Sequence, residues 1–170
     1  MRLSLLPKFI VHSITDLSPA LLRSQNIRLL MLDFDNTIMP YTAQTPTKEV
    51  LDYLQSLQDS EISVCVVSNS RKSRVPEFCE SHSLACITRA KKPFSKGINQ
   101  CISQFGFKPA SCALAGDQIY TDVLGANLAG VQSILVDAID NHNFWLRLRH
   151  TAELPFIFAA RKRRIRNEKY

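Results

Sequence analysis

Short, continuous hydrophobic runs alternate along this chain with stretches that have helical periodicity. Turn-forming residues bound the runs, which lie at residues 28–33, 62–68, 84–87, 111–116 and 131–136. Runs of this length without polar alternation are typical of strands that are buried on both faces of a parallel sheet. The pattern therefore predicts five buried parallel strands.

Two of the intervening stretches place their apolar residues on one helical face. The apolar positions are Val50, Leu51, Leu54 and Leu57 in the first stretch, and Ile98, Cys101, Ile102 and Phe105 in the second. Thr45 and Pro46 predict the start of the first helix. Strands that alternate with helices imply crossover connections. We therefore predict an α/β fold, a doubly wound parallel sheet with helices on both faces.

The composition is that of an ordinary globular protein. Of the 170 residues, 45% are hydrophobic and 21% are charged, which argues against disorder and against a disulfide miniprotein. The five cysteines form no C-x-x-C pair, so we interpret them as reduced core residues in a cytoplasmic compartment. No apolar run is long enough to span a bilayer as a helix. We predict a single domain over residues 1–153.

Polar clusters follow four of the predicted strands. They begin at Asp33, at Ser68, at Lys92 and at Gly116. Each cluster alone is compatible with a turn, because Asp, Asn and Ser bond readily to nearby backbone amides. In parallel α/β sheets, however, ligands bind beyond the carboxyl ends of the strands. We therefore expect the four clusters to converge on one functional site.

The motifs of the haloacid-dehalogenase-like phosphatases resemble four segments of this chain, D-F-D-N-T at 33–37, S-N-S at 68–70, K-P at 92–93 and G-D-Q-I-Y-T-D at 116–122. The resemblance covers residues 28–136. It implies that Asp33 attacks phosphorus and that Asp35 is the general acid and base. It also implies that Ser68 and Lys92 hold the phosphoryl group. A Mg²⁺ ion is expected on Asp117 and Asp33, joined by the backbone carbonyl of Asp35.

General chemistry supports these roles. A carboxylate nucleophile divides hydrolysis into two displacements, and a second acid can protonate the leaving oxygen and later activate water. Two carboxylates repel a phosphate, so the site needs Mg²⁺ and a lysine as counter-charge. Asn69, beside Ser68, is a further expected phosphate-binding residue. Asp122 is expected to orient the metal ligands, and Thr37 to brace the nucleophile loop.

Several basic residues leave alternatives open. Lys92 is assigned to the phosphate because the family lysine usually precedes proline, but Lys91 serves equally if the loop is shifted. Arg71 and Arg74 are within reach of an anionic substrate in principle, and we interpret both as solvated positions at a helix start.

The spacing of the motifs leaves no room for a cap domain, so the chain resembles the capless subclass IIIA. The leading L-L-P-K-F-I-V-H-S-I-T-D-L segment and V-S-N-S resemble the YqeG-like family, which is related to mitochondrial phosphatidylglycerophosphate phosphatases. That resemblance implies a membrane-associated substrate such as phosphatidylglycerophosphate. A soluble sugar or nucleotide phosphate, a nucleic-acid end and a non-catalytic binding module are the alternatives.

Positive charge is concentrated at the C-terminus. Residues 161–170 hold six basic residues and one acid, and thus five of the six net positive charges. They follow the apolar residues 154–160, so 154–170 forms an apolar-then-basic segment. Anionic membrane surfaces attract such segments, at about 1 kcal/mol per basic residue. The segment is equally compatible with peripheral association with the inner membrane face and with a docking helix that carries a solvated tail. Nucleic acid is disfavoured, because Tyr170 is the tail's one stacking residue.

Overall fold

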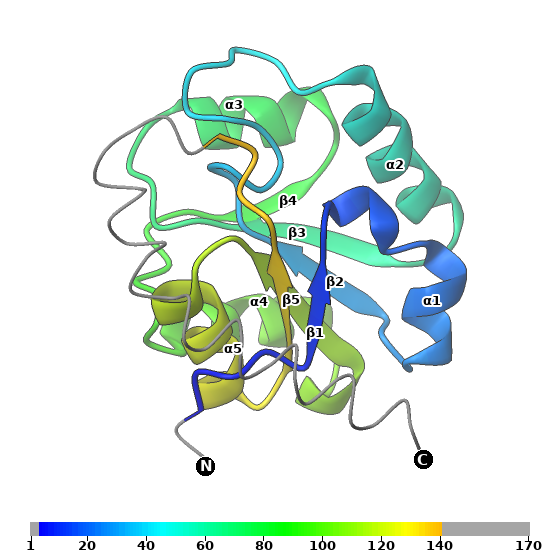
Figure 1. Ribbon diagram of the computed structural model, residues 1–170, viewed down its shortest axis with the longest axis vertical. Helices are drawn as coiled ribbons and strands as arrows, with labels where there is room; N and C mark the ends of the chain where they lie inside the picture. The colour runs from blue at the N-terminus through cyan, green and yellow to red at the C-terminus, as the bar shows by residue number, and fades with distance from the viewer. Residues whose placement is uncertain (1–3, 141–170) are drawn as a thin grey trace.

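The computed structural model describes residues 4–140 and shows one six-stranded sheet in which every pairing is parallel (Figure 1). The strand order is β1-β6-β5-β2-β3-β4. The strands are β1 (Phe9–Val11), β2 (Leu29–Leu32), β3 (Ser63–Val67), β4 (Ala85–Ile87), β5 (Cys112–Gly116) and β6 (Gln132–Val136). All five strands that the hydrophobic runs predict are present, and β1 is added at one edge.

Helices cover both faces of the sheet, so the predicted three-layer fold is confirmed. One face packs against α1 (Pro19–Ser24), α2 (Lys48–Asp59) and α3 (Arg74–Ser81), and the other against α4 (Lys96–Phe105) and α5 (Leu124–Ala129) (Figure 1). Short 3₁₀ turns lie at Ile14–Asp16 and Pro109–Ser111. Within residues 4–140 no further domain is inserted, in agreement with the expected capless architecture.

The central strand β2 shows why the hydrophobic runs are continuous. Leu30 and Leu32 belong to the core beneath α1, α2 and α3, whereas Leu29 and Met31 belong to the core beneath α4 and α5. All four side chains are fully buried. A strand covered by helices on both faces needs apolar residues at every position.

The start of α2 corrects the predicted boundary. The helix begins at Lys48, and its cap is Thr47, whose side-chain oxygen accepts a hydrogen bond from the backbone nitrogen of Val50 at 3.4 Å. The predicted start at Thr45 and Pro46 is therefore wrong by about one half-turn. Both Thr45 and Thr47 are chemically suitable caps, so sequence alone does not separate them.

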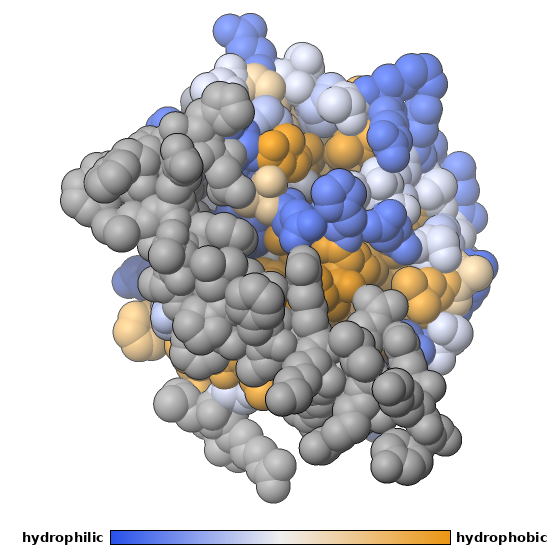
Figure 2. Space-filling view, viewed as in Figure 1, coloured by the Kyte–Doolittle hydropathy of each residue, from blue (hydrophilic) through white to orange (hydrophobic). Residues whose placement is uncertain are grey.

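The edge strand β1 was not predicted. It pairs with β6 in the register Phe9 to Ile134, and it lies beside a groove of about 1050 Å³. Figure 2 shows hydrophobic side chains gathered on the face that carries β1 and α1. None of the predicted site residues lines this groove, so the chemistry is located elsewhere.

The position of β2 in the sheet locates the site. From β2 the chain continues outward through β3 and β4, and then returns to the other side of β2 through β5 and β6. Asp33 therefore lies where the direction of winding reverses, which is the usual ligand site of such sheets. None of the helices within residues 4–140 is long and apolar enough to cross a membrane. The predicted domain end at residue 153 and the segment 154–170 lie outside the described residues.

Candidate active site

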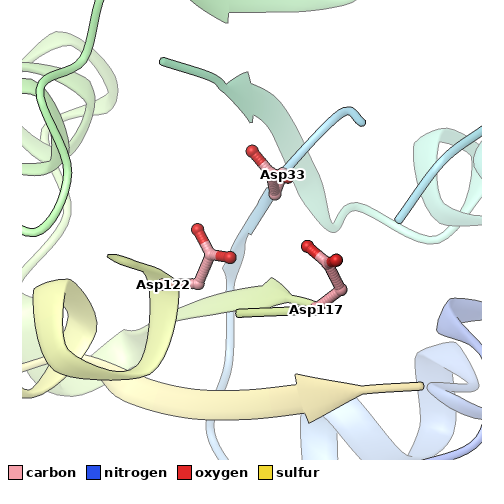
Figure 3. A group of neighbouring side chains, drawn as sticks. All are labelled: Asp33, Asp117 and Asp122. Atoms are coloured by element: carbon pink, nitrogen blue, oxygen red, sulfur yellow. The ribbon is translucent and has the colours of Figure 1, made fainter. Parts of the chain in front are cut away.

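Three buried carboxylates meet at the carboxyl end of the sheet (Figure 3). Asp33 directly follows β2, and its backbone nitrogen donates to the carbonyl of Ala115 on β5 at 2.9 Å. Asp117 follows β5, and Asp122 lies in the short π-helical segment η3 (Ile119–Val123). One oxygen from each carboxylate lies within 4.8 Å of the others.

Gly116 makes the approach of Asp122 possible. A Cβ atom at residue 116 would lie 2.4 Å from Cγ of Asp122, so a larger residue cannot be accommodated unless Asp122 moves. Oδ2 of Asp122 accepts a hydrogen bond from the backbone nitrogen of Gln118 at 3.1 Å. The spacing of the G-D-Q-I-Y-T-D motif thus turns two of its acids toward Asp33.

Lys92 supplies positive charge to this cluster. Its buried Nζ donates to Oδ1 of Asp33 at 2.6 Å. It also lies 2.6 Å from Oδ1 of Asp122, in an ion pair without hydrogen-bond geometry. The neighbouring Lys91 is exposed. The structure thus places Lys92, and not Lys91, beside the expected nucleophile.

The side chain of Asn69 clamps the backbone of Lys92. Its Oδ1 accepts from the Lys92 nitrogen at 2.7 Å, and its Nδ2 donates to the Lys92 carbonyl at 2.9 Å. The two residues lie on loops that follow neighbouring strands β3 and β4. This clamp is a function of Asn69 that the sequence does not reveal, because it depends on the pairing of the two loops.

Burial and charge oppose each other in the titration of the cluster. Burial raises the pKa of Asp33 to about 6, Lys92 acts to lower that pKa, and Asp122 acts to raise it. Burial also acts to lower the pKa of Lys92, but the carboxylates of Asp122 and Asp33 outweigh burial and hold it above its ordinary value. Lys92 is therefore a permanent cation at neutral pH.

Asp35 lies on the same loop but outside the carboxylate cluster. Its half-buried side chain is 3.8 Å from Nη1 of Arg74, and burial raises its pKa against the opposing charges of Arg74, Lys72 and Lys92. A raised pKa favours the protonated form that a general acid needs.

Arg74 organises the loop around Asp35. It donates to the carbonyl oxygens of Tyr41 at 3.0 Å and Pro40 at 3.3 Å, and its guanidinium lies over the ring of Phe34. It stands at a helix start, as predicted, but the interpretation as a simply solvated side chain is wrong. Phe34, between Asp33 and Asp35, was the signal in the sequence for a stacked arginine, because a guanidinium group packs well on an aromatic ring.

Ser68 directly follows β3 and Thr37 lies in the loop after β2, and both are buried. The Ser68 hydroxyl accepts from the backbone nitrogen of Ser70 at 3.0 Å, which leaves its proton available to a ligand. Within residues 4–140, Oγ1 of Thr37 has no hydrogen-bond partner. The contact by which Thr37 braces the nucleophile loop is therefore a backbone one, in which its nitrogen donates to the carbonyl oxygen of Phe34 at 3.4 Å.

The carboxylate cluster fits a divalent metal ion. It offers oxygen donors, which Mg²⁺ prefers, and within residues 4–140 Lys92 is the one lysine that pairs with its acids, Asp33 and Asp122. When all three acids are ionised, the buried group carries a net charge of about −2 that a divalent cation balances. The side chain of Asp122 belongs to this group and that of Asp35 does not. The resemblance had assigned Asp35 to the metal through its backbone carbonyl and not its side chain, and had given Asp122 the orientation of the metal ligands.

Comparison with known proteins identifies the family of the chain. Residues 24–136 match the family described as haloacid dehalogenase-like hydrolase. The chain is 29% identical over 159 residues to "Probable phosphatase YqeG" of Bacillus subtilis (strain 168), which covers 93% of this chain and 92% of that protein. The predicted family and the predicted enzyme class, a phosphatase, are thereby confirmed.

Solved structures of the same fold are more distant in sequence. A putative 3-deoxy-D-manno-octulosonate 8-phosphate phosphatase from Vibrio cholerae has a TM-score of 0.56 at 15% identity, over 77% of this chain and 76% of that one. A putative HAD superfamily (subfamily III A) hydrolase from Legionella pneumophila has a TM-score of 0.54 at 14% identity, over 75% and 72%. At these identities the likeness concerns the fold alone. With its matched region spanning most of the sheet and every carboxylate of the cluster, the chain belongs to the haloacid dehalogenase-like hydrolases.

Proposed function

We propose that this enzyme hydrolyses phosphate monoesters through an aspartyl-phosphate formed on Asp33, with Mg²⁺ as its cofactor. The observation that carries the proposal is the position of the Asp33 carboxylate. It is buried at the point where the sheet winding reverses, and it lies in contact with Lys92 and beside Asp117 and Asp122. A carboxylate that is held there with counter-charge around it is suited to attack phosphorus.

The first displacement forms the intermediate. A carboxylate oxygen of Asp33 bonds to phosphorus while the bond from phosphorus to the leaving oxygen breaks. Asp35 donates its proton to that oxygen, which the raised pKa of Asp35 favours. An ammonium group has three donors, and Asp33 accepts one of them, so Lys92 retains a donor for a phosphoryl oxygen. The Ser68 hydroxyl donates to another phosphoryl oxygen.

The second displacement releases phosphate. Asp35, now ionised, takes a proton from a water molecule that attacks phosphorus, and the bond between phosphorus and Asp33 breaks. The expected ligands of Mg²⁺ are the carboxylates of Asp33, Asp117 and Asp122 and the backbone carbonyl of Asp35. The ion supplies positive charge that offsets the charge of the phosphoryl group.

We further propose a large, membrane-associated substrate such as phosphatidylglycerophosphate, met at the inner membrane face. Two features support this. The described residues include no inserted cap that would enclose a small molecule, and residues 161–170 carry a net charge of +5 by sequence. Anionic lipid attracts such a segment. Soluble sugar or nucleotide phosphates and nucleic-acid ends are the competing substrates.

Hydrolysis of a chromogenic aryl phosphate, with Mg²⁺ and with chelator, tests the reaction. We expect turnover that Mg²⁺ restores and that Ca²⁺ inhibits, because Ca²⁺ prefers more ligands at longer distances. Full activity in chelator would refute the metal-assisted reaction, and no activity under any condition would favour a binding module.

A substrate panel and a tail deletion test the lipid assignment. The kcat/KM of the enzyme for phosphatidylglycerophosphate should be higher than its kcat/KM for sugar and nucleotide phosphates. Deletion of residues 161–170 should weaken binding to anionic liposomes at low salt and leave aryl phosphate hydrolysis nearly unchanged. Equal liposome binding with and without these residues would remove the main support for a membrane substrate.

A further inference from the structure

A cavity of about 510 Å³ opens beside the loops that carry Ser68 and Lys92. Its lining is basic and comprises Asn69, Arg71, Arg89 and Lys91. The volume falls within the range of roughly 300–1,000 Å³ that is usual for small-molecule sites. The three cations of this basic cavity have no part in the displacement steps at Asp33.

The basic cavity is built by the two loops that follow β3 and β4, which lie side by side in Figure 1. The loops are joined by backbone hydrogen bonds, from the nitrogen of Ala90 to the Ser68 carbonyl at 3.0 Å and from the nitrogen of Arg89 to the Ser70 carbonyl at 3.2 Å. The Asn69 clamp on Lys92 joins them again. The cavity wall and the catalytic lysine are therefore parts of one rigid unit.

Burial alternates along the second of these loops. Ala90 and Lys92 are buried, whereas Arg89 and Lys91 are exposed and line the cavity. One side of the loop thus delivers Lys92 to Asp33, and the other side presents two cations to the cavity. The loop therefore carries two centres of positive charge, Lys92 at Asp33 and the pair Arg89 and Lys91 at the basic cavity.

The outer cations lack the acidic partners that the inner one has. Lys92 pairs with two carboxylates, but no ion pair joins Arg71, Arg89 or Lys91 to an acid within residues 4–140. Like charges that line one cavity repel one another, and an anion bound between them removes that cost. Arginine is also the side chain best suited to bind phosphate oxygens through paired hydrogen bonds.

We propose that the basic cavity binds a second phosphate group of the substrate, a phosphomonoester or phosphodiester, while the reacting phosphomonoester lies at Asp33. This rests on the proposed phosphatase reaction and specifies its substrate class, a compound with two phosphate groups. Such a compound is either an anionic lipid headgroup or a free soluble molecule, and the shared feature is the second phosphate. The preference for a substrate with a second phosphate comes from Arg71 and Arg89, and not from the catalytic aspartates.

Calorimetric binding in an Asp33→Asn background tests this without a need for turnover. The probes are glycerol 3-phosphate, with one phosphate, and glycerophosphoglycerol phosphate, with a second phosphate as a diester. The second probe should bind at least about tenfold more tightly, the usual effect of one charge-assisted hydrogen bond. Adding Arg71→Gln and Arg89→Gln should remove the preference. Adding Lys108→Gln should retain it, because this exposed residue lies before η2 (Pro109–Ser111), which precedes β5 and so lies at the opposite end of the parallel strands from the cavity.

Equal affinity for the two probes, or a preference that survives loss of both arginines, would overturn the proposal. The same headgroup presented as a lipid in micelles forms the second arm. A preference in solution and in micelles supports recognition of the phosphate itself, whereas a preference in micelles alone would show that the arginines bind the lipid surface, against the proposal. Failure of the phosphatase reaction is seen separately, as absent aryl phosphate hydrolysis by the unaltered enzyme with Mg²⁺.

Discussion

Asp33→Asn should abolish turnover and also stabilise the metal-free protein at neutral pH. An amide does not attack phosphorus usefully, so activity is lost. The stability effect follows from burial. Burial raises the pKa of Asp33 from 3.8 to about 6, which means that the folded protein binds this proton more tightly than the unfolded chain does. Ionisation of Asp33 therefore opposes folding above that range, and an uncharged Asn removes the cost.

The size of the effect follows from the same two values. A change from 3.8 to about 6 is about two pKa units, and at about 1.4 kcal/mol per unit the full cost is about 3 kcal/mol. This cost is complete above the folded pKa and declines as the pH falls toward the unfolded one. When the pH is lowered from about 7.5 to about 4.5, the free energy of unfolding of the wild type should rise by about 2 kcal/mol relative to that of Asp33→Asn.

Denaturant unfolding in chelator at these two pH values measures the difference. The stability advantage of Asp33→Asn should be larger at the higher pH, and Mg²⁺ should reduce it by binding the three carboxylates of the wild type more tightly than the two that remain in the variant. Asp52→Asn on the exposed face of α2 controls for loss of one negative charge. An advantage that does not change with pH, or that grows as the pH falls, would refute the assignment of a destabilising buried carboxylate to Asp33.

Three further substitutions test neighbouring parts of the site. Asp35→Asn should slow hydrolysis of the intermediate more than its formation from an aryl phosphate, so a burst of product should precede slow turnover; a proportional loss of both phases would contradict the general-base role. With an aryl phosphate, which has no second phosphate for the basic cavity, Lys92→Met should lower kcat by roughly 10²–10³, as loss of one positioned donor does, whereas Lys91→Met should change it less than about twofold; equal effects would show that the loop is shifted in solution. Gly116→Ala should weaken Mg²⁺ binding in calorimetry, because its methyl group displaces Asp122, and unchanged affinity would mean that Asp122 is not needed for the metal.

The fold was predictable where tertiary packing leaves a local signature. The central strands are continuous apolar runs because helices cover both faces, as Leu29 and Leu30 of β2 illustrate. The edge strand β1 has only three paired residues, and α1 has only six residues in all. Elements this short are stabilised by their neighbours and not by their own periodicity, so the sequence did not reveal them.

The site was predictable as a set of positions but not as a set of contacts. The rule that ligands bind beyond the carboxyl ends of parallel strands brings Asp33, Lys92 and Asp117 together from sequence alone. The clamp from Asn69 to Lys92 joins residues 23 apart, and its existence depends on how two loops pair. The place of Asp122 in the carboxylate cluster likewise depends on the turn of η3.

Identification of the phosphorylated residue decides whether Asp33 is the nucleophile. Asp35→Asn, which should accumulate the intermediate, is mixed with an excess of aryl phosphate and Mg²⁺, quenched in acid, and digested for mass spectrometry of its peptides. We expect one acid-stable, hydroxylamine-sensitive phosphate, located on Asp33, and none in the Asp33→Asn variant. Phosphate on any other residue, or active turnover by Asp33→Asn, would contradict this assignment.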